Sequence, residues 1–238
     1  NLFFILGVAG LVTPLVVQSS TISKEIPISL IAAILLFLLA NSFFSDEALL
    51  SRWDAVILLI LFAGFLYYVY WQLKREPEKA QIQKSNLSVT KIWIFIVVGL
   101  GGLVFGGRLV VNSAVEMATA WGVSEQLIGL TIVAMGTSLP ELATTVVAAV
   151  KRKTDIAVGN IIGSNIFNIF FILGASALVR PIPYDPVFNN DLYLLFGGTV
   201  FLFIAMFIGG KKKLDRWEAG ILLAVYIMYT IYLITKEV

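Results

Sequence analysis

The sequence of 238 residues contains no cysteine and no histidine. The absence of cysteine excludes disulfides and thiolate metal sites, and the absence of histidine removes the side chain that most often carries protons near neutral pH. Charged residues make up only 13% of the chain, and the net charge of +2 is too small to indicate binding to nucleic acid. We therefore expect no nucleic-acid partner and no cofactor held by thiolate or imidazole.

Apolar residues, by contrast, make up 59% of the chain, and its mean hydropathy of +0.92 excludes an ordinary soluble domain. The chain opens inside an apolar run near the minimum length for a span, and most later runs reach the roughly 20 residues needed to cross a bilayer. The runs cover residues 1–17, 26–44, 53–73, 92–111, 127–150, 156–179, 191–208 and 217–235. The sequence thus predicts an all-α polytopic membrane protein with about eight spans, the first of them partial.

Basic residues alternate between the two sides of these spans. One side has Lys24, Lys74, Arg75, Lys79, Lys84, Lys91, Lys151, Arg152, Lys153, Lys211, Lys212, Lys213 and Arg216, and the other has Arg52, Arg108, Arg180 and Lys236. Cytoplasmic loops carry the excess of lysine and arginine in membrane proteins. We expect the polar linker 74–91 to be cytoplasmic and the C-terminus to lie outside, in a plasma or inner membrane.

The most informative stretch, residues 129–168, is an apolar segment interrupted twice by small and polar residues. Pro140 in the first interruption, Gly-Thr-Ser-Leu-Pro-Glu at 136–141, lacks an N–H, so the carbonyl of Gly136 loses its helical partner and can face a ligand. An acid inside a span is costly and normally faces a cavity or pathway, as we expect for Glu141. Thr137 lies four residues before Glu141 and shares its helix face.

The second interruption contains Ser164, Asn165 and Asn168, and Ser164 and Asn168 are again four residues apart. Hydroxyl, amide, carboxylate and freed carbonyl oxygens are the ligands of a hard cation such as Ca²⁺ or Na⁺. Alternative interpretations apply to each part taken alone: a proline kink, close helix packing between Gly159 and Gly163, or hydroxyls bonded to their own backbone.

The two interruptions, in this order and joined by a short basic turn, closely resemble the second α-repeat of the sodium/calcium exchangers of the calcium/cation antiporter superfamily. The resemblance implies an inverted-repeat antiporter with ten spans, of which this chain holds about eight, and a transporter of Ca²⁺ and Na⁺, not an enzyme. It also implies the ligands: carbonyls of Ala134 and Thr137, hydroxyls of Thr137, Ser138 and Ser164, the Glu141 carboxylate, and Asn168, with Asn165 beside them. Some relatives have an acid at the position of Asn168, so the amide argues against potassium coupling.

An internal repeat supports the inverted arrangement. Residues 1–14 align with 168–181 and are identical at nine of fourteen positions, and residues 50–55 match 214–219. This alignment predicts a first repeat over 1–73 with three spans, a linker over 74–91, and a second repeat over 92–238 with five spans. Asn1 is the counterpart of Asn168 and the one expected ligand from the first repeat, most of whose α-repeat is missing.

A site between two repeats needs both of them, and a single carboxylate leaves a bound Ca²⁺ with uncompensated charge. We therefore expect the chain to be a fragment with half a site, completed by a missing segment or by a second copy. Two alternatives remain open: proton coupling through Glu141, and an inactive structural subunit. An intramembrane protease is disfavoured, because histidine is absent and the aspartates lie at span ends.

Overall fold

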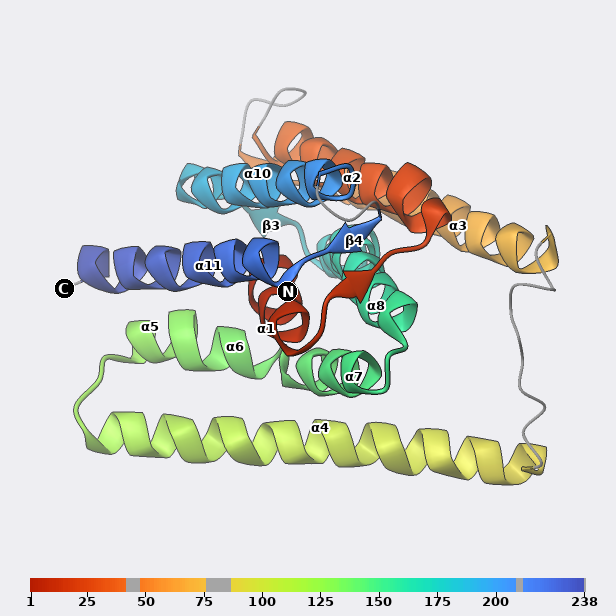
Figure 1. Ribbon diagram of the computed structural model, residues 1–238. Helices are drawn as coiled ribbons and strands as arrows, with labels where there is room; N and C mark the ends of the chain where they lie inside the picture. Colours follow the sequence, from red (N-terminus) through yellow and green to blue (C-terminus); the bar gives the residue numbers. More distant parts are fainter. Residues whose placement is uncertain (42–47, 76–86, 209–211, 238) are drawn as a thin grey trace.

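A computed structural model of the chain describes residues 1–41, 48–75, 87–208 and 212–237. It confirms the all-α prediction (Figure 1): the elements are helices apart from four two-residue strands, which the sequence analysis did not foresee. In the first part of the chain these elements are α1 (Leu2–Val12), β1 (Leu15–Val16), the π-helix η1 (Thr21–Glu25), α2 (Ile26–Ala40), β2 (Leu49–Leu50), α3 (Arg52–Arg75) and α4 (Val89–Ala120).

The remaining elements contain the interrupted segments. They are α5 (Glu125–Ile128), the π-helix η2 (Gly129–Val133), α6 (Ala134–Gly136), α7 (Leu139–Val150), α8 (Thr154–Phe167), the π-helix η3 (Asn168–Leu173), α9 (Gly174–Val179), β3 (Ile182–Pro183), the 3₁₀-helix η4 (Pro186–Phe188), α10 (Asn189–Ala205), β4 (Lys213–Leu214) and α11 (Arg216–Glu237).

Six helical stretches among the described residues are long and apolar enough to cross a membrane, and α1 and α7 are shorter apolar helices. The predicted run 127–150 is divided among α5, η2, α6 and α7, because the turn at Thr137 and Ser138 interrupts it. The exact number of crossings stays a prediction. Of the predicted linker 74–91, residues 76–86 lie outside the described part of the chain.

One predicted boundary is wrong. The run 92–111 was expected to end at residue 111 with Arg108 near a loop, but α4 continues through Asn112 to Ala120. The residues after Val111 include good helix formers and no proline or glycine, so nothing in the sequence stops the helix there. Arg108 therefore lies inside a helix of 32 residues, and its charge carries no weight in the loop count.

Each copy of the repeated sequence packs against a helix from the other copy. Helix α1 packs on α11, while the counterpart of α1, formed by η3 and α9, packs on α3. The short strands pair in the same crossed way, β1 with β4 and β2 with β3. Arg216 donates to the carbonyl of Val12 at 3.4 Å, and Arg52 donates to the carbonyl of Val179, also at 3.4 Å. Equivalent residues thus make equivalent contacts with the opposite copy, as two-fold related repeats require.

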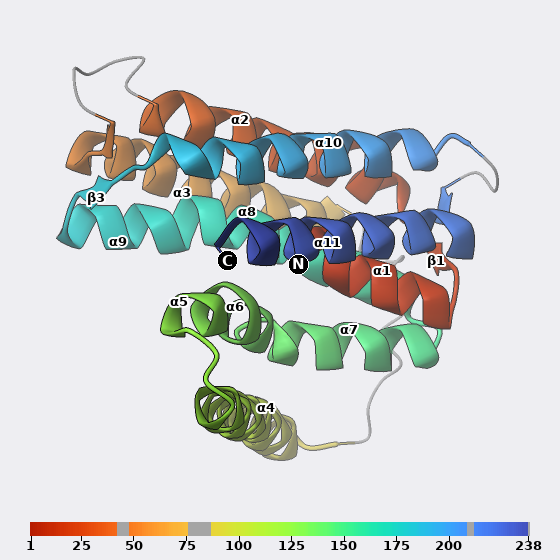
Figure 2. The ribbon, with the colours of Figure 1, turned by 90° about the vertical axis from the view of Figure 1, so that its left-hand side faces the viewer.

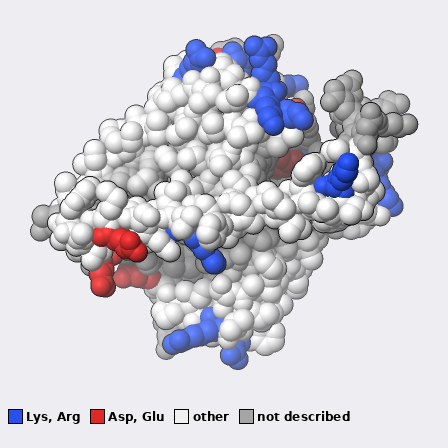
Figure 3. Space-filling model, turned by 90° about the horizontal axis from the view of Figure 1, so that it is seen from below, with Lys and Arg blue, Asp and Glu red and all other residues white. Residues whose placement is uncertain are grey.

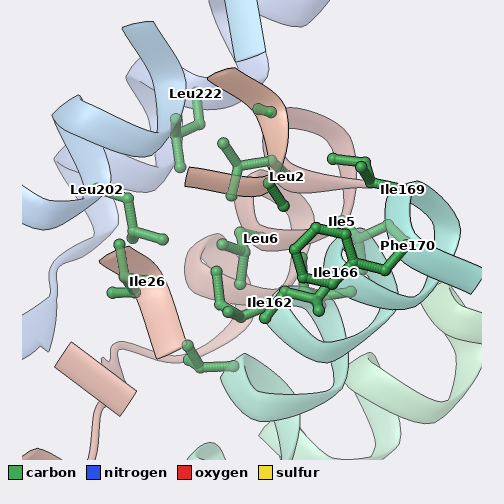
Figure 4. Packing of buried hydrophobic residues seen from close by; sticks show 14 of the residues in the cluster. Leu2, Ile5, Leu6, Ile26, Ile162, Ile166, Ile169, Phe170, Leu202 and Leu222 are labelled. Carbon is green, nitrogen blue, oxygen red and sulfur yellow. The ribbon is translucent and has the colours of Figure 1, made fainter. Parts of the chain in front are cut away.

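Helix α1 lies at the centre of the bundle, where it contacts α7, α8, α10 and α11. It is apolar around its whole circumference, which is typical of a helix enclosed by others. Ile5 and Leu6 are fully buried and point toward residues of α8 and the neighbouring helices (Figure 4). A Cβ added to Gly10 would lie 2.5 Å from the Cβ of Ala219, so the small residues let α1 and α11 approach closely.

Helix α4 stands apart from this bundle, and its main contacts among the described residues are with α5 to α7 and η2 (Figures 1 and 2). The face of the molecule on the side of α4 is mostly uncharged, with acidic side chains gathered at one end and basic side chains near its middle and along its edges (Figure 3). A large uncharged surface of this kind suits contact with lipid.

Candidate ion-binding site

The first interruption is a break between two helices. Helix α6 ends at Gly136, Thr137 and Ser138 form a turn, and α7 begins with Pro140 in its first turn. The hydroxyl of Thr137 donates to the carbonyl of Ala134 at 3.0 Å, so two predicted ligands are bonded to each other. Both residues are exposed among the described atoms, and Ser138 is half-buried.

Glu141 lies in the first turn of α7, where the partial positive charge of the helix N-terminus favours a carboxylate. Its Oε2 atom is buried and has no hydrogen-bond partner among the described residues. Buried carboxylate oxygens are rarely left unpaired, because desolvation without a partner costs several kcal/mol. Oε2 of Glu141 therefore has the character of a ligand atom for a cation.

The second interruption faces the first. Helix α8 packs against α7, and Ser164 and Asn165 lie near its C-terminal end. The Nδ2 atom of Asn165 is buried without a partner in the described structure, the second such atom in this region after Glu141. Ser164 is half-buried, and its hydroxyl donates to the carbonyl of Ile161 at 3.0 Å.

Asn1 meets the second repeat at this point. Its Nδ2 atom donates to the hydroxyl of Ser164 at 3.4 Å. The structure thus joins Asn1 to Ser164, and α1 and α8 both pack against α7, which carries Glu141. Asn168 is placed differently: it opens the π-helix η3, and its side chain is exposed among the described residues.

A polar pair that the sequence analysis did not assign extends the site by one helical turn. Asn160 donates to Thr145 at 3.0 Å and to Thr144 at 3.2 Å, and Thr145 is fully buried. Thr145 follows Glu141 by four residues, and Asn160 precedes Ser164 by four, so each shares a helix face with a predicted ligand. This spacing is the signal in the sequence that could have identified the pair.

A cavity of about 310 Å³ lies between α4 and the broken turn, and its lining includes Arg108, Asn112 and Thr137. The close approach of α4 depends on Gly136, because a Cβ there would lie 2.0 Å from Cγ2 of Val111. Gly159 and Gly163 do not act in this way: nothing in the described structure lies within 4 Å of a Cβ built on either of them. Among the described residues, these two glycines therefore make no close helix packing contact.

The donor set around Glu141 consists of one carboxylate with amide and hydroxyl groups, and all of these oxygens are hard ligands. No group of three or more acidic, histidine or cysteine side chains occurs in the described ranges, so acidic clustering is not what marks this site. The bundle is apolar, and its broken helix presents polar groups inside it. This arrangement, with two copies of a repeat packed against each other, is typical of polytopic membrane proteins of the secondary-transporter class.

The chain belongs to the sodium/calcium exchanger protein family, whose profile matches residues 1–71 and 91–235. It is 35% identical to the putative antiporter CaxA of Alkalimonas amylolytica, over 96% of this chain and 73% of that protein. It is 37% identical to the inner membrane protein YrbG of Escherichia coli K12, over 79% of this chain and 59% of that protein. Among solved structures, the sodium-calcium exchanger NCX_Mj soaked without Na⁺ and Ca²⁺ superposes with a TM-score of 0.76 at 30% identity, covering 96% of this chain and 70% of that one.

Proposed function

We propose that the chain acts in a secondary antiporter that exchanges Ca²⁺ for Na⁺ across a membrane, with Glu141 as the central ligand. The observation that carries the proposal is the buried, unpartnered Oε2 of Glu141 beside a broken helix. Family membership supports the reaction type, and the relatives named as exchangers or antiporters support it further.

The remaining ligands follow from the same geometry. Asn1 donates to Ser164 on α8, which packs against the helix of Glu141, and Asn165 would contribute its amide oxygen. Carbonyls of Ala134 and Thr137, together with Ser138 and Asn168, complete the proposed set. A cation would take the place of the hydrogen bond that Oε2 of Glu141 lacks and so remove the cost of burying it.

Charge limits what this set can hold alone. One carboxylate neutralises a bound Na⁺, but it leaves a bound Ca²⁺ with one positive charge in a region of low dielectric constant, which is costly. Ca²⁺ also takes about six to eight oxygens. We infer that a further acidic ligand comes from outside the described residues, either from another segment or from a second copy of the chain.

Alternating access requires an element that moves past a fixed site. Helix α4 is the candidate, because its main contacts in the described structure are with the broken segment α5 to α7 and η2. Four of its glycines, Gly99, Gly101, Gly102 and Gly106, have nothing described within 4 Å of an added Cβ. These positions therefore make no close packing contact in the described structure, whereas Val111 lies against Gly136 and would have to shift if α4 moves.

The membrane and the orientation belong to the proposal as well. The chain would lie in the inner or plasma membrane with loop 74–91 in the cytoplasm and the C-terminus outside. The positive-inside rule supports this orientation even when Arg108 is left out of the count.

The test is uptake of radioactive Ca²⁺ into sodium-loaded proteoliposomes containing the 238-residue chain. Glu141→Gln should reduce uptake by at least about a hundredfold, because removing one partner of a buried charge pair costs roughly 3 kcal/mol or more. Glu116→Gln is the matched control, since Glu116 is exposed on α4. Equal and measurable uptake by both variants would contradict the role of Glu141; if the unaltered chain shows no uptake, thermal stabilisation by Na⁺ replaces uptake as the readout, and its survival in Glu141→Gln would contradict that role.

Two further arms of the assay address coupling and completeness. Uptake driven by a proton gradient without Na⁺ would favour the alternative, a proton-coupled exchanger that protonates Glu141. An initial rate that rises with the square of the protein-to-lipid ratio would indicate that two copies complete one site. A chain that neither transports nor is stabilised by Ca²⁺ or Na⁺ would support the inactive structural subunit.

A further inference from the structure

A second cavity lies far along the bundle from Glu141, where α2 begins and α10 ends. The two helices run side by side (Figure 2), and the cavity between their ends has a volume of about 660 Å³. This volume falls within the range of small-molecule sites in proteins. Most of its lining is apolar and includes Ile22, Pro27, Phe203 and Phe207.

The other end of the cavity is polar. Ser19, Ser23 and Lys212 line it. Lys212 donates from Nζ to the hydroxyl of Ser19 at 2.7 Å, and the hydroxyl of Ser23 donates to the carbonyl of Ser19 at 2.8 Å. An ammonium group has three donors, so Lys212 keeps donors for a ligand beyond Ser19.

The backbone holds Lys212 in an unusual conformation. Its φ of 61° lies in the left-handed region, which costs a non-glycine residue roughly 1–2 kcal/mol. The N–H of Lys212 donates to the carbonyl of Met206 at 2.9 Å, and its carbonyl accepts from Val17 at 2.8 Å. These two hydrogen bonds hold the backbone of Lys212 between Met206, at the end of α10, and Val17, just after β1. Strain retained at one residue is a frequent feature of ligand clamps.

The charges nearby leave Lys212 as the cation of this cavity. Lys213 is 2.6 Å from Asp215 and is therefore neutralised by it. Asp155 accepts from Gln18 at 3.0 Å in the adjacent cavity, which Lys24 also lines. An anion in the larger cavity thus meets Lys212 and the hydroxyl of Ser19, while the hydroxyl hydrogen of Ser23 is already donated to the carbonyl of Ser19.

We propose that this cavity binds an anionic phospholipid, with the phosphate at Lys212 and Ser19 and an acyl chain along Phe203 and Phe207. The aromatic rings of Phe203 and Phe207 are 5.2 Å apart, and Phe207 is 63% exposed, so an acyl chain there would cover apolar surface. The chain is an integral membrane protein, and basic pockets between helices at the membrane surface are known to hold lipid headgroups. A free phosphate would satisfy only the polar end.

The experiment is native mass spectrometry of the purified chain after exchange into detergent with either palmitoyl-oleoyl phosphatidylglycerol or the zwitterionic phosphatidylcholine of the same chains. We expect tighter retention of phosphatidylglycerol. Lys212→Asn should weaken it by about fivefold, the effect of one lysine near a membrane surface. Asparagine tolerates the left-handed backbone, so the fold is preserved. Lys212→Arg should restore retention, and Lys236→Gln, at the end of α11, should leave it unchanged.

Two additional arms separate the lipid from its parts. Inorganic phosphate and glycerol 3-phosphate should not displace the lipid, while Phe203→Ala should weaken both phospholipids alike. Equal retention of the two lipids by the unaltered chain, an effect of Lys236→Gln as large as that of Lys212→Asn, or displacement by inorganic phosphate would each overturn the proposal.

Discussion

Replacing Gly136 by alanine tests how α4 is seated on the broken helix. The new Cβ would lie 2.0 Å from Cγ2 and 3.3 Å from Cβ of Val111, far inside the 3.5–4.0 Å at which carbon atoms attract. Overpacking of this kind costs about 1–3 kcal/mol unless the neighbouring element moves away. Because α4 has few other contacts, part of the strain should be relieved by displacement of α4 from the turn at Thr137.

The measurement is the free energy of unfolding from sodium dodecyl sulfate titration in mixed micelles, followed by circular dichroism. Gly163→Ala is the control, because an added Cβ there meets nothing described within 4 Å and alanine is a better helix former than glycine. Val111→Ala combined with Gly136→Ala should recover most of the loss, with a coupling energy of about 1–3 kcal/mol. Equal stabilities of Gly136→Ala and Gly163→Ala, or additive effects of the two substitutions, would refute this reasoning.

Three other predictions follow from single contacts. Thr145→Val removes the acceptor that Asn160 reaches at 3.0 Å and should lower the free energy of unfolding by about 1 kcal/mol, measured in the same titration. Arg108→Gln should strengthen cation binding, because it removes a positive charge from the cavity beside Thr137. Electrostatic energy is proportional to the charge of the ion, so the fold-change in Ca²⁺ affinity should be the square of the fold-change in Na⁺ affinity. Isothermal titration calorimetry with both ions measures the two fold-changes, and Arg108→Lys should leave both affinities unchanged. The absence of cysteine allows single cysteines at Lys153 and Lys236 to be labelled in sealed vesicles: a membrane-impermeant maleimide should reach them from opposite sides, and labelling of both from one side would contradict the proposed topology.

The sequence by itself determined the class of fold. Composition and run length require helices in a membrane, because only a helix satisfies its own backbone in lipid. The cost of burying charge made Glu141 the leading candidate ligand, because a carboxylate inside an apolar span is unfavourable unless it faces a cavity or a partner. The repeat between 1–14 and 168–181 also indicated an inverted arrangement, with which the contacts of α1 with α11 and of α9 with α3 agree.

Helix boundaries and side-chain environment needed the tertiary structure. No local signal ends a helix at Val111, so the length of α4 and the position of Arg108 inside it were not accessible from hydropathy. All four of Asn168, Thr137, Ser164 and Glu141 were expected as ligands. In the structure Asn168 and Thr137 are exposed, whereas Ser164 and Glu141 are half-buried. A motif fixes which residues share a helix face, but burial depends on which helix covers that face.

The short strands and the partners of Asn160 show the same limit. The pairs β1 with β4 and β2 with β3 join residues far apart in the chain, and two-residue strands have no periodicity to reveal them. Asn160 was visible within the motif, but only the packing of α8 on α7 turned it toward Thr145. The sequence thus determined the membrane helices and the candidate carboxylate Glu141, because these depend on local energetics. The tertiary structure decided which polar atoms are paired and which have no partner among the described residues, because pairing depends on contacts between distant helices.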